Sequence, residues 1–203
     1  MATSLETRTG TGTSGVAIAD LTNDALIIRL HFTINHLSRW LTPIHDPTRM
    51  MRTVRRGEPT VKELLLRLRD EELRVFPRLH AIAVQTQPDL DKLPVPGRTE
   101  EQERHDRDVK PLEVMAEFRR LRQSTASLLR SLPDTAWART GTSRLEHDWS
   151  IRALAEHLAR HDYLVLSEME QALDRNGARE GVNTAARAPL AELLKLVPTS
   201  TRR

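Results

Sequence analysis

Apolar side chains recur along this chain at spacings of three and four residues, which is the repeat of an amphipathic helix. Strand-like alternation is nearly absent. Each helical stretch carries a narrow apolar stripe, and four such stripes are buried when the helices pack against one another. The pattern therefore predicts an all-α fold, a four-helix bundle with helices over about residues 21–41, 59–84, 111–132 and 149–173.

Residues with strong backbone preferences mark the predicted helix ends. Thr22 and Ser150 are predicted N-caps of the first and fourth helices, and Pro59 is expected at the first position of the second. Pro77 lies inside the second helix and is expected to bend or split it. Pro133 ends the third helix.

The segments outside the four helices are polar. Residues 85–108 contain three prolines and many charges, and we predict a long crossover between helices two and three, formed by a loop rather than a packed element. Residues 1–15 are predicted to be a disordered N-terminal tail. The bundle is expected over residues 16–176. Residues 177–203 are a predicted C-terminal tail with one short helix, which either docks on the bundle or stays loose.

Composition excludes several classes of function. The 203 residues include no cysteine, so disulfides, thiolate metal sites and thiol nucleophiles are excluded. Lys and Arg total 31 against 28 Asp and Glu, and the two signs alternate along the helices, so no nucleic-acid-binding face is predicted. No apolar run approaches the roughly 18–20 residues of a membrane span, and no secretory signal is recognised. We expect a cytoplasmic protein with neither nucleic acid nor membrane as a partner.

Two acidic residues interrupt the apolar stripes, Glu72 in the second helix and Asp162 in the fourth. An unpaired buried carboxylate is costly, so each is predicted to have a partner or to be protonated. Arg122 and His31, at the edges of the third and first stripes, are the candidate partners. The set forms either an ion network that sets the register of the helices or a functional pocket.

A pair of histidines is the second candidate for chemistry. His157 and His161 are four residues apart, so both reach one point beside the fourth helix. Two ring nitrogens can hold zinc or another divalent transition metal when at least one more ligand joins them. The alternative is a pair of hydrogen-bonding residues on the helix flank. His36 is expected to be exposed. The chain has no HExxH motif, phosphate loop or Ser–His–Asp order.

Two stretches of the chain resemble the second half of the DinB-like (DinB/YfiT) superfamily: "AEFRRLRQSTASLLRSLPDTAWART" and "WSIRALAEHLARHDYLVLSEME". The stretch "TVKELLLRLRDEELRVFPRLHAI" resembles the second helix of that superfamily, and the similarity covers about residues 21–173. The resemblance implies a four-helix bundle, commonly with a long crossover and often dimeric. In many members it also implies a divalent metal between helix two and the last helix. Some members are metal-dependent thiol transferases or isomerases.

The ligand set that the resemblance implies is incomplete here. Its usual ligands are one His on helix two and the two His of an H-D-x-x-H motif on the last helix. His161 and Asp162 match the start of that motif, but the next ligand position is Val165, and the position on helix two falls at or beside Arg67. A divalent ion needs at least three neutral or anionic protein ligands. We therefore predict no metal and no other cofactor.

The resemblance suggests a role for Arg67 at this position. We expect its guanidinium, steadied by Glu71, to replace the cation in part. The other interpretation is that Arg67, Glu71, Arg74 and Arg78 form a charged helix flank held by pairs one turn apart.

Three functions remain open. The first is a bundle with a degenerate metal site that is non-catalytic or binds a small-molecule ligand, with Arg67, Glu72, Arg122, His161 and Asp162 as candidate binding residues. The alternative is a metal-dependent enzyme, a thiol S-transferase or isomerase, whose divalent transition metal is held by His157, His161 and an acid such as Glu72. The third is a structural or interaction bundle, such as a homodimer joined through helix faces.

Overall fold

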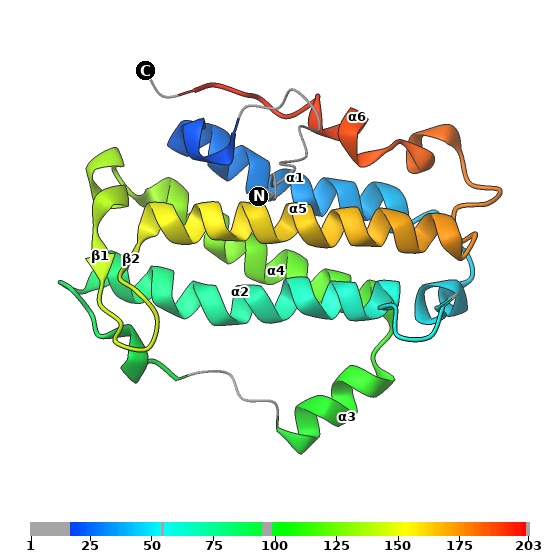
Figure 1. The fold of residues 1–203 in the computed structure, drawn as a ribbon, viewed down its shortest axis with the longest axis horizontal. Coiled ribbons are helices and arrows are strands. Elements are labelled where there is room, and N and C mark those ends of the chain that lie inside the picture. Colours follow the sequence, from blue (N-terminus) through cyan, green and yellow to red (C-terminus); the bar gives the residue numbers. More distant parts are fainter. Residues whose placement is uncertain (1–16, 54, 95–98, 202–203) are drawn as a thin grey trace, which may run out of the picture.

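Four long helices pack side by side in the computed structural model, which describes residues 17–53, 55–94 and 99–201 (Figure 1). The predicted N-terminal tail, residues 1–15, lies outside the described residues. The all-α fold class and the four-helix bundle are confirmed. The four helices are α1 (Asn23–Leu41), α2 (Val61–Val84), α4 (Pro111–Ser131) and α5 (Ile151–Arg175).

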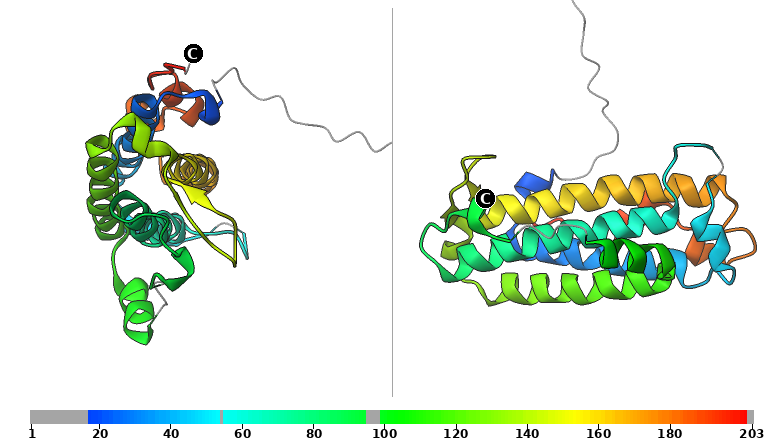
Figure 2. Two further views of the ribbon diagram at one scale, coloured as in Figure 1. Left: turned by 90° about the vertical axis from the view of Figure 1, so that its left-hand side faces the viewer. Right: turned by 90° about the horizontal axis from the view of Figure 1, so that it is seen from below.

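The order of the helices around the bundle differs from their order in the chain. Both α1 and α2 pack against α4 and α5. Figure 1 and Figure 2 show that α1 and α5 run in one direction while α2 and α4 run in the other. Because α2 and α4 are parallel neighbours, the chain between them returns along the length of the bundle.

Part of this connection is a helix, whereas a loop was predicted. The described part holds a short turn, η3 (Leu90–Lys92), and the helix α3 (Glu100–Asp108). The buried Arg69 of α2 donates to both carboxylate oxygens of Asp106 in α3, at 2.6 and 2.8 Å. Lys62 donates to the carbonyl of Arg107 at 2.8 Å. Side chains of α2 thus order a charged segment that has no apolar stripe.

The starts of the helices follow their capping residues. Thr22 and Ser150 each accept a hydrogen bond from the backbone N–H three residues later, so both are N-caps as predicted. Helix α2 begins two residues later than predicted, because Thr60 is its N-cap and Pro59 lies outside it. Thr60 and Glu63 accept each other's backbone N–H, which forms a capping box.

Helix α2 is continuous through Pro77, which therefore does not split it. The other described elements are short: η1 (Ile18–Asp20), η2 (Pro47–Met51), η4 (Asp134–Ala138) and an antiparallel pair of two-residue strands, β1 (Thr140–Gly141) and β2 (Trp149–Ser150). Within the described ranges, no helix has an apolar stretch of the length that a membrane span needs.

The core consists of two apolar clusters, one towards each end of the bundle. A polar layer separates them, formed by Thr33 of α1, Glu72 of α2, Arg122 of α4 and Asp162 of α5, all buried. On each helix these residues lie between the positions that contribute to the two clusters. All four long helices therefore meet at one charged level.

The C-terminal segment passes back over α1 and α5 (Figure 1). It includes η5 (Thr184–Arg187) and the short helix α6 (Leu190–Leu194). Leu190 and Leu193 are buried in one of the apolar clusters. The ring N–H of Trp40 donates to a carbonyl just before α6. Of the two possibilities left open by the sequence, the structure shows the docked helix.

Candidate functional site

The side chain of Arg122 lies at the centre of the bundle and binds both buried acids. Its Nε donates to Glu72, and its two terminal nitrogens donate to Asp162. Thr125 and Thr33 donate their hydroxyl groups to Glu72 and Asp162, each at 2.6 Å. Arg122, one of the two candidate partners, therefore pairs with both acids.

Each charged group of this central network has a partner of opposite charge, although two carboxylates share one guanidinium. Burial opposes the charge of Arg122, but Asp162 and Glu72 outweigh that effect, so the pKa of Arg122 is raised. Arg122 also donates to the carbonyl of Leu30 at 3.0 Å. His31 is not a hydrogen-bond partner of either acid in the described structure. This geometry suits an ion network that sets the register of four helices better than it suits a ligand-binding pocket.

A second cluster of charged side chains lies on the outer face between α2 and α5. Arg74 donates through Nε and Nη2 to the two carboxylate oxygens of Glu71, at 3.1 and 2.5 Å. Nε2 of His157 lies 2.5 Å from one of the same oxygens. Because an ionised carboxylate only accepts hydrogen bonds, we assign the His157 proton to Nε2. Nη2 of Arg74, 3.1 Å from that nitrogen, is then a second donor to the same carboxylate.

The two donors keep Glu71 ionised. Burial of the Glu71 carboxylate opposes ionisation, but the hydrogen bonds from His157 and Arg74 outweigh burial and lower its pKa to about 2. At neutral pH the ionised Glu71 carboxylate therefore accepts hydrogen bonds from both the Arg74 guanidinium and the His157 ring.

Arg67 does not belong to this cluster, so the expected contact between Arg67 and Glu71 is wrong. The half-exposed side chain of Arg67 donates to Glu168 of α5 at 2.9 Å. The Glu71 carboxylate contacts Arg74, one helical turn later, and His157 on the neighbouring helix α5 instead. The sequence could not reveal this choice, because acids and arginines alternate along α2 and several pairings satisfy the helical spacing.

His161 lies one turn beyond His157 on α5, and the two rings stack with their centroids 6.5 Å apart. Nδ1 of His161 is buried and has no hydrogen-bond partner among the described residues, and burial lowers the pKa of the ring. Val165, at the next ligand position implied by the resemblance, is buried in the apolar core.

These residues do not fit the metal that the resemblance implies. Among the side chains that the structure describes, no group of three or more His, Asp or Glu is arranged to hold a metal ion. The Glu71 carboxylate is bound by the Arg74 guanidinium, and His157 directs a proton rather than a lone pair towards it. A divalent cation would have to displace both the Arg74 guanidinium and the proton on Nε2 of His157.

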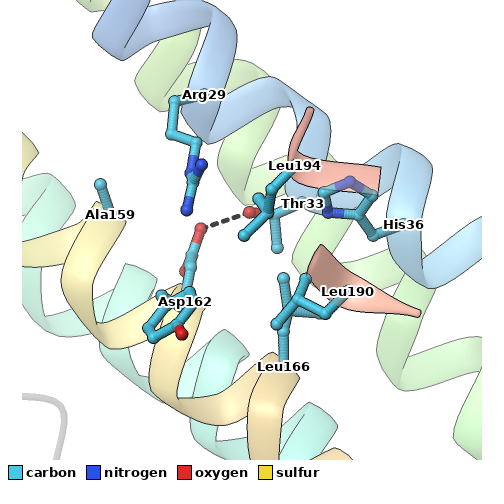
Figure 3. Close-up of a pocket in the computed structure, with 9 residues that line it drawn as sticks. Arg29, Thr33, His36, Ala159, Asp162, Leu166, Leu190 and Leu194 are labelled. Atoms are coloured by element: carbon cyan, nitrogen blue, oxygen red, sulfur yellow. Dashed lines mark hydrogen bonds between the residues drawn. The ribbon is translucent and has the colours of Figure 1, made fainter. Parts of the chain in front are cut away.

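A cavity of about 10 Å³ lies on another side of Asp162, between α1, α5 and α6 (Figure 3). His36 lines this cavity and is buried, so the expectation that it is exposed is wrong. The signal in the sequence was the row of polar residues at spacings of four and three on α1, which are Arg29, Thr33 and His36. The residues around the cavity are Arg29, Thr33, His36, Ala159, Asp162, Tyr163, Leu166, Leu190 and Leu194.

The helices and their packing define a DinB/YfiT-like four-helix bundle, the fold that the resemblance implied. Among solved structures, the chain is similar to YfiT from Bacillus subtilis, a probable metal-dependent hydrolase with an unusual four-helix bundle topology. The TM-score is 0.63 and the identity 16%, over 76% of this chain and 87% of that chain, and at this identity the likeness shows the fold alone. No protein-family model and no curated protein matches the sequence.

Proposed function

We propose that this chain is a non-catalytic protein that binds a small molecule, and that its metal site is degenerate. The observation that carries the proposal is the position of Arg74. Its guanidinium binds the Glu71 carboxylate, the acid nearest to His157, on the face between α2 and α5 where the resemblance implies a metal. Arg74 takes the place that we expected for Arg67.

The chemistry of the three side chains supports this proposal. Metal binding at Glu71 and His157 requires an unshared carboxylate and a ring nitrogen without its proton. Here the Arg74 guanidinium, a permanent cation, is bound to the Glu71 carboxylate. Nε2 of His157 donates a hydrogen bond to the same carboxylate. The second pair, Arg67 with Glu168, is a direct ion pair between α2 and α5 on the same face.

The metal content of the protein tests the proposal. The protein is purified without a metal-affinity tag, and bound zinc, nickel, manganese and iron are measured per chain. We expect no stoichiometric metal and no rise in Tm when zinc is added. Stoichiometric metal in the natively purified wild-type protein would overturn the proposal.

A metal-dependent enzyme, a thiol S-transferase or isomerase, is the second candidate. The observation that favours it is the grouping of Glu71, His157 and His161 on one face, although the acid is Glu71 and not Glu72. Retained metal together with metal-dependent transfer to a low-molecular-weight thiol would support this candidate. A cytoplasmic location and a homodimer joined through helix faces stay predictions. Size-exclusion chromatography with light scattering tests the dimer.

A further inference from the structure

The cavity beneath the C-terminal segment is lined by a cation that forms no ion pair within the described residues. Arg29 of α1 directs its guanidinium towards Asp162 (Figure 3), but the two form no ion pair, and Arg29 has no other hydrogen-bond partner in the described structure. Asp162 already accepts two hydrogen bonds from Arg122 and one from Thr33. Burial is the main cause that lowers the pKa of Arg29, and the negative charge of Asp162 offsets part of this shift. A half-buried guanidinium without a partner is expected to attract an anion.

A second polar group in the same cavity is almost completely buried. His36 is 4% exposed, and neither ring nitrogen makes a hydrogen bond within the described residues. Burial and the nearby Arg29 lower its pKa to about 4, and the carbonyl of Leu193 offsets only part of this shift. The ring is therefore neutral at pH 7 and offers one N–H donor. Leaving buried polar atoms unpaired costs free energy, so the arrangement calls for an explanation.

The short helix α6 closes this cavity. Leu190 and Leu194 place their aliphatic side chains over it from the C-terminal segment (Figure 3). The remaining space of about 10 Å³ is what one water molecule needs. A helix of five residues has little stability of its own, so its position depends on its contacts with the bundle. Two of these contacts are single hydrogen bonds, from Trp40 to the Ala188 carbonyl and from the Leu190 N–H to Glu170.

We propose that the cleft between α1 and α5 binds a small branched aliphatic monocarboxylate, and that α6 occupies the cleft when this ligand is absent. The carboxylate pairs with Arg29 and accepts the N–H of His36. The aliphatic chain takes the space of the two leucine side chains, which act as an internal substitute for it. A monoanion suits the cleft better than a dianion, because Asp162 also lines it.

This inference rests on the proposed function in one respect, since both describe a protein that binds a small molecule. The two sites are separate, because Arg74 lies on the face between α2 and α5 and Arg29 lies between α1 and α5. Metal content tests the first site, and carboxylate binding tests the second. A protein that retains metal and still binds the carboxylate would defeat the proposed function and leave the present inference standing.

Calorimetric titration of the full chain with 4-methylpentanoate tests the cleft. We expect weak binding to the wild-type protein. Binding should be about tenfold tighter for Leu194→Ala. Weaker docking of α6 raises the fraction of chains in which the cleft is open to the ligand. Arg29→Gln should weaken it by about tenfold or more, because a charge-assisted pair is lost. The control Leu196→Ala changes an exposed leucine of the same segment and should leave the affinity unchanged.

Two further measurements make the test specific. The uncharged analogue 4-methylpentan-1-ol should bind more weakly than the carboxylate. The NMR signal of the Trp40 ring N–H should shift as the carboxylate is added, because displacement of α6 removes its hydrogen bond to Ala188. Circular dichroism verifies that each variant is folded. Absence of binding to both the wild-type protein and Leu194→Ala, or equal binding to Arg29→Gln, would overturn the inference.

Discussion

Arg122 and Asp162 form a bidentate ion pair where the two apolar clusters of the core meet. The pair joins α4 to α5, and the contact of the same guanidinium with Glu72 adds α2. One arginine thus binds two carboxylates at a level with almost no exposed surface. If the arginine is removed, the two acids stay buried without a cation in a medium of low polarity. If the acids are removed, the arginine stays buried without an anion.

Replacement of the central arginine is expected to be strongly destabilising. Arg122→Met leaves Glu72 and Asp162 buried without their cation, and we expect a loss of about 3–5 kcal/mol in the free energy of unfolding. Urea titration followed by circular dichroism measures it. Arg119→Met on the exposed side of α4 is the matched control, with an expected change within about 0.5 kcal/mol. Equal effects of the two substitutions would show that the central network does not stabilise the fold.

Acid should weaken the contact of α2 with α5 through Glu71. The folded pKa of about 2 is below the ordinary value of 4.5, so the stability that Glu71 contributes is complete above pH 4.5. This contribution is lost as the pH falls from 4.5 towards 2. In Glu71→Gln the stability at neutral pH should be lower and its decline over that range smaller. Urea midpoints measured between pH 2 and 7 compare the two proteins, with Glu168→Gln as the half-exposed control.

A separate dependence on pH is expected from His36, whose folded pKa of about 4 is below the ordinary 6.5. The unfolded chain binds the proton more readily between these values, so stability is highest above pH 6.5 and falls as the pH decreases to 4. The shift corresponds to up to about 3 kcal/mol. Tm measured from pH 7 to 4 should fall less in His36→Asn than in the wild-type protein. His80→Asn, at an exposed position, should keep the wild-type slope.

The attachment of α3 should depend on Arg69. This arginine contacts Asp106 of α3, and it also contacts Asp70 and Glu117. In Arg69→Met we expect the amides of residues 100–108 to exchange with solvent faster while those of α2 and α4 stay protected. Hydrogen exchange followed by mass spectrometry measures both. Lys92→Met removes an exposed pair with Asp89 in the same connection and should leave the exchange of α3 unchanged.

The four helices and the central network could be predicted because their signals are local or are forced by burial. A stripe of apolar residues at helical spacing specifies a helix and its buried face wherever that helix packs. Thr22 and Ser150 act within one turn of their own helices, so their capping roles need no tertiary information. An acid in the middle of an apolar stripe needs a cation, and Arg122 lay at the edge of another stripe.

The partners of the surface charges and the position of the short segments depended on the tertiary structure. Glu71 had several arginines at suitable helical spacing, and only the antiparallel packing of α2 on α5 places His157 beside it. His36 is buried because α6, about 150 residues later in the chain, covers it. Helical periodicity is a property of neighbouring residues, and the sequence alone therefore determined the elements and their apolar faces. Which polar side chains meet depends on helices that are distant in sequence, and only their packing decided it.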